Sequence, residues 1–309
     1  MDAARRRWYD FRTSRTGRGS PTDPIPPAPG APMFIRIGYD IEFDVPSPTA
    51  MMMLLRVHPS VEPSLRGPEA LAIEPDVPAV EFTDGFGNRA RRILAPAGTL
   101  RLTNDAVVEV DGLPDPEAPD AREVPIHELP PEVMPFLLAS RYCEVDRMSE
   151  MAWDLFQKTP PGWARVQAIV DWVHDHIEFG YPHARWTKSA FDAHAEAKGV
   201  CRDFTHLAVT FCRCMNIPAR YVTGYLGDIG VPASPDPMDF SAWFEVYLGG
   251  RWHTFDARHN KRRIGRILMA KGRDAVDVAL TTSFGPTTLK RFVVWTDEVT
   301  DATGETKAG

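Results

Sequence analysis

Residues 199–207 have the sequence Gly-Val-Cys-Arg-Asp-Phe-Thr-His-Leu, in which a Gly-Val pair precedes a cysteine. The apolar side chains after this cysteine recur at helical spacing: Phe204, Leu207, Ala208, Phe211 and Met215. This pattern predicts a helix that begins at Cys201. The first N–H groups of a helix have no internal partners and the helix dipole is positive there, so a thiolate is favoured. The sequence therefore predicts a nucleophilic cysteine at position 201.

The segments around this helix predict further helices before it and strands after it. Helices are expected at 146–158, with Asp146 as cap, at 162–177, and from Ser189 to Gly199, where Ser189 and Asp192 resemble a capping box. Strands are expected at 221–226, 242–248, 251–257 and 292–295. Helices followed by antiparallel strands indicate an α+β fold.

The hairpin around Gly249-Gly250 determines which side chains share a face. Its two-residue loop places Leu248 opposite Arg251. Directly paired residues share a face, and side chains alternate along a strand. One face should therefore carry Ser241, Trp243, Asp256 and Arg258. His253 lies opposite Val246 and points to the other face.

The N-terminal part of the chain has the pattern of strands. Apolar side chains at odd positions from Ile35 to Val45 alternate with polar ones, which predicts a strand with one wet face. Further strands are expected at 51–57, in a hairpin at 82–94, and at 100–110. The predicted organisation is a disordered tail (1–32), an antiparallel β domain (33–110), a Pro-rich linker (111–135), a core (136–298) and a frayed C-terminus (299–309).

Composition and charge limit the classes of partner. The formal net charge of −7 argues against a general binder of nucleic acid or of anionic membranes. No apolar run approaches the roughly 20 residues of a membrane-spanning helix. The arginines at 5–7 are not followed by the apolar stretch of a signal peptide, so we expect a cytoplasmic location. Order is predicted to begin at Met33, which suggests that Met33 is the biological start.

The cysteines do not indicate a disulfide framework or a metal site. There are four of them: Cys143, Cys201, Cys212 and Cys214. Cys212 and Cys214 are two residues apart in a helical pattern and point in different directions, which favours small core residues. We predict neither a metal nor a cofactor, and the oligomeric state is open.

Four blocks of sequence together resemble the transglutaminase-like superfamily of papain-type folds: residues 199–203, 217–225, 239–247 and 249–258. The resemblance covers residues 163–257, and the β domain before them is similar to the N-terminal region of bacterial transglutaminase-like proteins. It implies that Cys201 attacks an amide carbonyl to form a thioester and that Asp256 orients a histidine base. The motif places that histidine directly before Ala242-Trp243, where this chain has Ser241.

Serine cannot usefully accept the thiol proton near neutral pH, so an active site would need another histidine as its base. His253 has the wrong direction in the hairpin, and His206 lies about 140° around the helix from Cys201, which favours a structural role. His183 precedes the helix and could line the cleft. If the strand ends at Ala257, the direction of His259 is free, and it is either a substitute base or a loop histidine.

Several other residues are candidates for the cleft. Trp243 adjoins the position of the missing histidine and could form a wall. Asp203 suits the first turn of its helix and could also pair with Arg220. The loop 227–237, rich in proline, is long enough to border a cleft.

Two functions remain open from the sequence. The chain could be a cysteine acyltransferase or hydrolase of a peptide or protein amide, working through a thioester on Cys201. Alternatively it is a catalytically impaired member that binds a peptide or protein in the same cleft. Cys201 and Asp256 favour the first function, and Ser241 favours the second.

Overall fold

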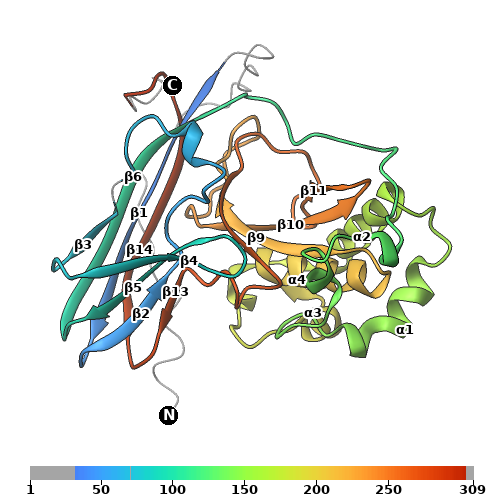
Figure 1. Cartoon of the computed structure of the whole chain (residues 1–309), viewed down its shortest axis with the longest axis horizontal. Helices are drawn as coiled ribbons and strands as arrows, with labels where there is room; N and C mark the ends of the chain where they lie inside the picture. The colour runs from blue at the N-terminus through green and yellow to red at the C-terminus, as the bar shows by residue number, and fades with distance from the viewer. Residues whose placement is uncertain (1–31, 70, 304–309) are drawn as a thin grey trace.

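The structure, a computed structural model, describes residues 32–69 and 71–303 of the chain. The predicted tail therefore lies, apart from Pro32, outside the described residues. The prediction that Met33 is the start depends on that tail and stays a prediction. Two lobes lie side by side in Figure 1, a lobe of long strands and a lobe of helices and strands. We call them the β lobe and the core lobe.

The β lobe consists of two antiparallel sheets. Their strand orders are β14-β1-β6-β3 and β13-β2-β5-β4. The strands are β1 (Met33–Val45), β2 (Thr49–Met53), β3 (Ala72–Glu74), β4 (Ala79–Thr83), β5 (Arg89–Ala95), β6 (Gly98–Val110), β13 (Thr281–Ser283) and β14 (Thr288–Val299). A short 3-10 helix, η1 (Glu62–Ser64), lies between β2 and β3. The apolar face predicted for β1 is confirmed, because Ile35, Ile37 and Ile41 are at most 1% exposed, but the other face is only partly wet, since Gly38 and Asp40 are buried as well.

The C-terminal strands belong to the β lobe, which corrects the predicted boundary of the core at residue 298. β14 pairs antiparallel with β1 from Phe34↔Val299 to Asp44↔Thr288, and β13 pairs with β2. β14 is also longer than the predicted strand at 292–295. Alternation predicts that a segment is a strand but not which strand it joins, so the sequence pattern could not supply this pairing.

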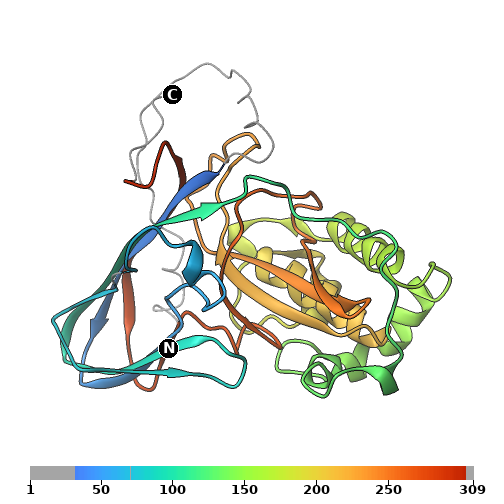
Figure 2. The same cartoon turned by 45° about the horizontal axis from the view of Figure 1, so that its top comes forward.

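The core lobe has an antiparallel sheet of order β11-β10-β9-β12, with helices on one face (Figure 2). Its helices are α1 (Val145–Phe156), α2 (Trp163–His176), α3 (Ala190–Glu196) and α4 (Cys201–Cys214). Its strands are β9 (Ala219–Tyr225), β10 (Ser241–Leu248), β11 (Arg251–Phe255) and β12 (Ile267–Gly272), with a small parallel pair of β7 (Glu178–Phe179) and β8 (Lys198–Gly199). Short 3-10 helices are η2 (Ile126–Glu128), η3 (Met134–Leu137) and η4 (Tyr181–His183).

This arrangement confirms the α+β class and most predicted helices. Ser189 and Asp192 form the predicted capping box of α3, but that helix ends at Glu196, where Ala197 adopts a left-handed conformation. The N-cap of α1 is Glu144, and Asp146 lies within the first turn instead.

Helix α4 is the centre of the core lobe. Its apolar side chains, which include Phe204, Leu207 and Phe211, are buried where α4 packs against the other three helices and the strands β9 and β10. Complete burial of each such side chain is worth roughly 1.5–3 kcal/mol. The packing of α4 against β10 holds the helix N-terminus beside the first residues of that strand.

The hydrophobic core of the β lobe extends into the core lobe. Tyr225 and Phe240 of the core lobe pack with Tyr39 of β1, with ring centroids 5.0 Å apart for Tyr225–Phe240 and 6.1 Å for Tyr39–Phe240. Phe240 directly precedes β10, so the β lobe anchors the start of that strand.

The Pro-rich segment passes from β6 over the core lobe to the helices (Figures 1 and 2). It is bound along its course rather than free. Pro114 pairs with Ile264, Gly249 donates to Arg122 O at 2.8 Å, and the carboxylate of Glu123 accepts from Gly162 N at 2.9 Å. Among the described residues, no helix is both long and apolar enough to cross a membrane.

Candidate active site

The N-terminus of α4 is built around a buried carboxylate. Asp203 is fully buried, and its Oδ2 accepts the N–H of Val200, the residue that precedes the helix, at 3.0 Å. A side chain at Gly199 would place its Cβ 2.7 Å from Asp203, closer than packing allows. The Gly-Val-Cys sequence therefore lets the chain pass over Asp203 and begin the helix at Cys201, as predicted.

The thiol of Cys201 is more buried than its position on the helix suggests. Burial, together with the smaller effect of the charge of Asp239, raises its pKa to about 11. Arg258 and the backbone N–H of Ala242 act in the opposite direction but do not compensate. The expectation that the helix position favours a thiolate is therefore corrected: near neutral pH Cys201 is a thiol.

The carboxylate of Asp256, the residue directly after β11, binds several groups of the site. Its Oδ1 accepts the N–H groups of Arg258 and His259, each at 3.0 Å. Its Oδ2 lies 2.8 Å from Nδ1 of His259 and 2.9 Å from Nη2 of Arg266. Burial disfavours the charge, but Arg266 and His259 outweigh it and hold the pKa of Asp256 well below its usual range. An ionised carboxylate only accepts, so Nδ1 of His259 donates and Nε2 carries no proton in the neutral ring.

The hairpin has the predicted register but a shorter second strand. The pairs run from Phe244↔Phe255 to Leu248↔Arg251, and His253 lies opposite Val246. β11 ends at Phe255, not at Ala257, because the Asp256 carboxylate turns the chain back through its bonds to the following N–H groups. The predicted pairing of Ser241 with Arg258 therefore does not form. The same turn brings His259 to Asp256.

One small cleft brings the main candidates together. Cys201, Ser241 and His259 all line it, with a free volume of about 50 Å³. Tyr181, Asp239 and residues of the loop 227–237 complete its wall, so the predicted border loop is confirmed. Cys201, the serine at the motif's histidine position and the histidine bound to Asp256 thus line a common space.

Two residues predicted near the cleft lie outside its lining. Trp243 is 3% exposed and lies under the guanidinium of Arg266, 5.0 Å from its ring centroid. Asp203 is buried beneath the helix N-terminus. Its nearest cation is Arg202 at 3.5 Å, whereas Arg220 pairs with Glu245 at 2.5 Å. The suggested cleft positions of Trp243 and Asp203 are therefore corrected.

The other histidines have structural contacts. His253 is buried, with Nε2 3.2 Å from Leu248 O. His206 is fully buried, accepts the N–H of Ala275 at 3.2 Å and stacks on Tyr142. His183 is not among the residues that line the cleft. Of the histidines considered as bases, His259 is the one that meets both Asp256 and the cleft.

Arg266 and Tyr181 are site residues that the sequence did not indicate. Arg266 belongs to no motif, and its partners lie ten and 151 residues away along the chain. Tyr181 precedes Cys201 by twenty positions, and burial together with Asp239 raises its pKa to about 12. Within residues 32–69 and 71–303, no three His, Cys, Asp or Glu side chains are grouped as a metal site needs.

Comparisons with known proteins support the resemblance to the transglutaminase-like superfamily. A family model described as the transglutaminase-like superfamily matches residues 150–257. A solved structure from Cytophaga hutchinsonii, described as a candidate cysteine protease, is 32% identical with a TM-score of 0.76. That match covers 89% of this chain and 94% of the other.

Two curated relatives give shorter matches. An uncharacterised protein of Mycobacterium leprae is 27% identical over 60% of this chain and 67% of its own length. Human kyphoscoliosis peptidase is 30% identical over 39% of this chain but only 19% of its own length. The second match is thus limited to one part of a much longer protein.

Proposed function

The chain belongs to the transglutaminase-like superfamily, and from this premise we propose that it is a cysteine enzyme that attacks a peptide or protein amide. Cys201 is the nucleophile and Asp256 is the acid that orients the base. His259 is the base, because the motif position of the histidine holds Ser241. The observation that carries this proposal is the 2.8 Å contact of His259 with Asp256 on the cleft that Cys201 also lines.

The proposed reaction follows acyl-transfer chemistry. Nε2 of His259 takes the thiol proton as the sulfur of Cys201 bonds to the amide carbon. N–H groups in the first turn of α4 stabilise the negative oxygen of the tetrahedral intermediate. The imidazolium then protonates the amine as the C–N bond breaks, which leaves a thioester. Water or a second amine attacks the thioester and releases the acid or a new amide.

The roles of Asp256 and Ser241 differ in this scheme. Asp256 stays ionised and holds the tautomer that leaves Nε2 free to accept the proton. Ser241 takes no part in proton transfer. Because the pKa of the Cys201 thiol is about 11, the reaction should be slow near neutral pH and faster in alkali.

A second function is favoured by two observations. Ser241 stands at the motif position of the base, and burial raises the pKa of the Cys201 thiol to about 11. Both suit a member of the family that binds a peptide or protein segment in the cleft without cleaving it.

The deciding experiment measures alkylation of Cys201 and hydrolysis of peptide amides from pH 6 to 10. Cys201→Ser should abolish both, and His259→Gln should lower the rate of hydrolysis at least 10²-fold, the usual share of a general base. His253→Gln is the matched control, because this histidine lies on the other face of the hairpin. If the wild type hydrolyses no amide yet binds peptides, the binding function is correct. If His259→Gln equals the wild type, His259 is not the base.

A further inference from the structure

We propose that Asp115 and Arg266 are positioning residues that hold Asp256 in place and set the charge that His259 meets. This inference rests on the proposed function, because it concerns the acid and base of that site. It also gives the Pro-rich segment a role in the chemistry, since Asp115 comes from that segment.

Arg266 bridges two carboxylates through separate nitrogens. Its Nε lies 2.8 Å from Oδ2 of Asp115, and its Nη2 lies 2.9 Å from Oδ2 of Asp256. The side chains of Arg266 and Asp256 are 6% and 3% exposed. Buried ion pairs of this kind are screened little by water, and the loss of one partner leaves an uncompensated charge.

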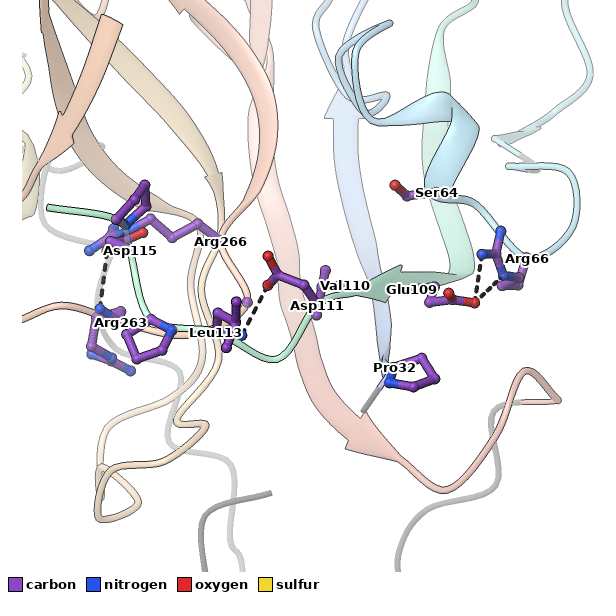
Figure 3. A pocket seen from close by; sticks show the side chains of 13 residues that line it. Pro32, Ser64, Arg66, Glu109, Val110, Asp111, Leu113, Asp115, Arg263 and Arg266 are labelled. Carbon is purple, nitrogen blue, oxygen red and sulfur yellow. Dashed lines mark hydrogen bonds and ion pairs between the residues drawn. The ribbon is translucent and has the colours of Figure 1, made fainter. Parts of the chain in front are cut away.

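Asp115 is itself held on the core lobe. Its backbone N–H donates to Arg263 O at 2.9 Å, and its Oδ2 accepts the N–H of Arg263 at 3.0 Å. Its carbonyl accepts from Nε of Arg262 at 2.5 Å. Figure 3 shows Asp115 between Arg263 and Arg266, at one end of a pocket of about 690 Å³ beside the junction of the two lobes. The carboxylate therefore has little freedom to leave Arg266.

Trp243 completes the arrangement. Its indole lies against the guanidinium of Arg266, at 5.0 Å, on the strand that begins with Ser241. A planar cation between an aromatic face and two carboxylates is restrained in orientation as well as position. This contact explains why Trp243 is buried and not part of the cleft wall.

The charges of Asp115 and Arg266 predict that removing one or the other has opposite effects on the protonation of His259. Without Arg266, the full negative charge of Asp256 would face His259 and favour the imidazolium. Without the charge of Asp115, the positive charge of Arg266 would be less compensated and would disfavour the imidazolium. The other charged groups on the cleft stay the same in both variants: Asp228, Asp236, Asp239, Arg258 and Arg263. If Asp115 and Arg266 had only a structural role, both substitutions would loosen the site and change the protonation of His259 in the same direction.

The test follows the ring protons of His259 by NMR as a function of pH, with the resonance assigned through His259→Gln. In Asp115→Asn the midpoint of the titration should fall relative to the wild type, and in Arg266→Gln it should rise. Glu117→Gln is the matched control. It breaks the ion pair of the same segment with Arg262, at 3.3 Å, which does not reach Asp256.

The proposal would be overturned if the titration midpoints of the two variants shifted in the same direction or did not shift. If Arg266→Gln does not fold, Arg266→Lys keeps the charge and should leave the midpoint near that of the wild type, so the shift in Asp115→Asn decides. The readout does not require catalysis. If the midpoints shift in opposite directions but the protein is inactive, the proposed enzyme activity is wrong and this inference stands. If the protein is active but the midpoints do not shift, only this inference is wrong.

Discussion

Ser241 occupies the position at which the family motif has its histidine base. It is 7% exposed at the first position of β10, on the same cleft as Cys201 and His259. The helix pattern predicted the position of Cys201, and the resemblance to the transglutaminase-like superfamily implied the role of Asp256 and the departure at Ser241. The sequence could not place His259, since that depends on how the chain turns after Phe255.

Replacing Ser241 by histidine should restore the family's base beside the thiol. We expect the pKa of Cys201 in Ser241→His to fall below its value of about 11, because an imidazolium next to the sulfur stabilises the thiolate. The rate of Cys201 alkylation at pH 7 should rise at least tenfold. Ser241→Ala is the control for the loss of the hydroxyl and should behave like the wild type. An unchanged rate in Ser241→His would show that position 241 does not face the sulfur.

Helix α4 and the hairpin β10–β11 are the elements that position the site. Both were predicted from the sequence, because their helical spacing and two-residue loop are local signals. The partners of β14 were not predictable, because they come from the opposite end of the chain. The position of Arg266 was missed for the same reason, as its two acceptors belong to separate segments.

The start of α4 should be sensitive to a single methyl group. In Gly199→Ala the new Cβ would meet Asp203 at 2.7 Å and disturb its bond to Val200 N. We expect a loss of about 1–3 kcal/mol in the free energy of unfolding, measured with urea. Gly85→Ala is the matched control, because a Cβ there meets no atom within 4 Å. Equal stability of the two variants would contradict this account of the helix start.

At the scale of the whole molecule, the β lobe and the core lobe stabilise each other through a common interface. Phe240 and Tyr225 enter the core of the β lobe, and the backbone N–H of His58 donates to Leu268 O across the interface at 2.9 Å. His58 is buried, with Nδ1 2.8 Å from the hydroxyl of Ser60. Burial lowers the pKa of His58 to about 4, and the charges of Lys271 and Arg220 act in the same direction.

This histidine should make the interface sensitive to acid. Between pH 6.5 and about 4 the unfolded chain binds a proton that folded His58 does not, so stability falls as the pH decreases through this window. The free energy of unfolding of the wild type should therefore drop by roughly 1–3 kcal/mol more than that of His58→Gln between pH 7 and 4. Urea unfolding at several pH values measures the difference. Parallel curves for both proteins would show that His58 does not titrate in this range.

The return of β14 to β1 has a consequence for how the polypeptide folds as it is made. Asp40 and Arg291, which form an ion pair across these strands, are separated by 251 residues. At roughly 5–20 residues per second, a ribosome needs about 10–50 s to supply this partner after β1 has emerged. During that time the core segments can collapse on their own short-range contacts, while one edge of β1 waits unpaired. The β lobe is therefore completed last, when β13 and β14 add to strands that were synthesised first.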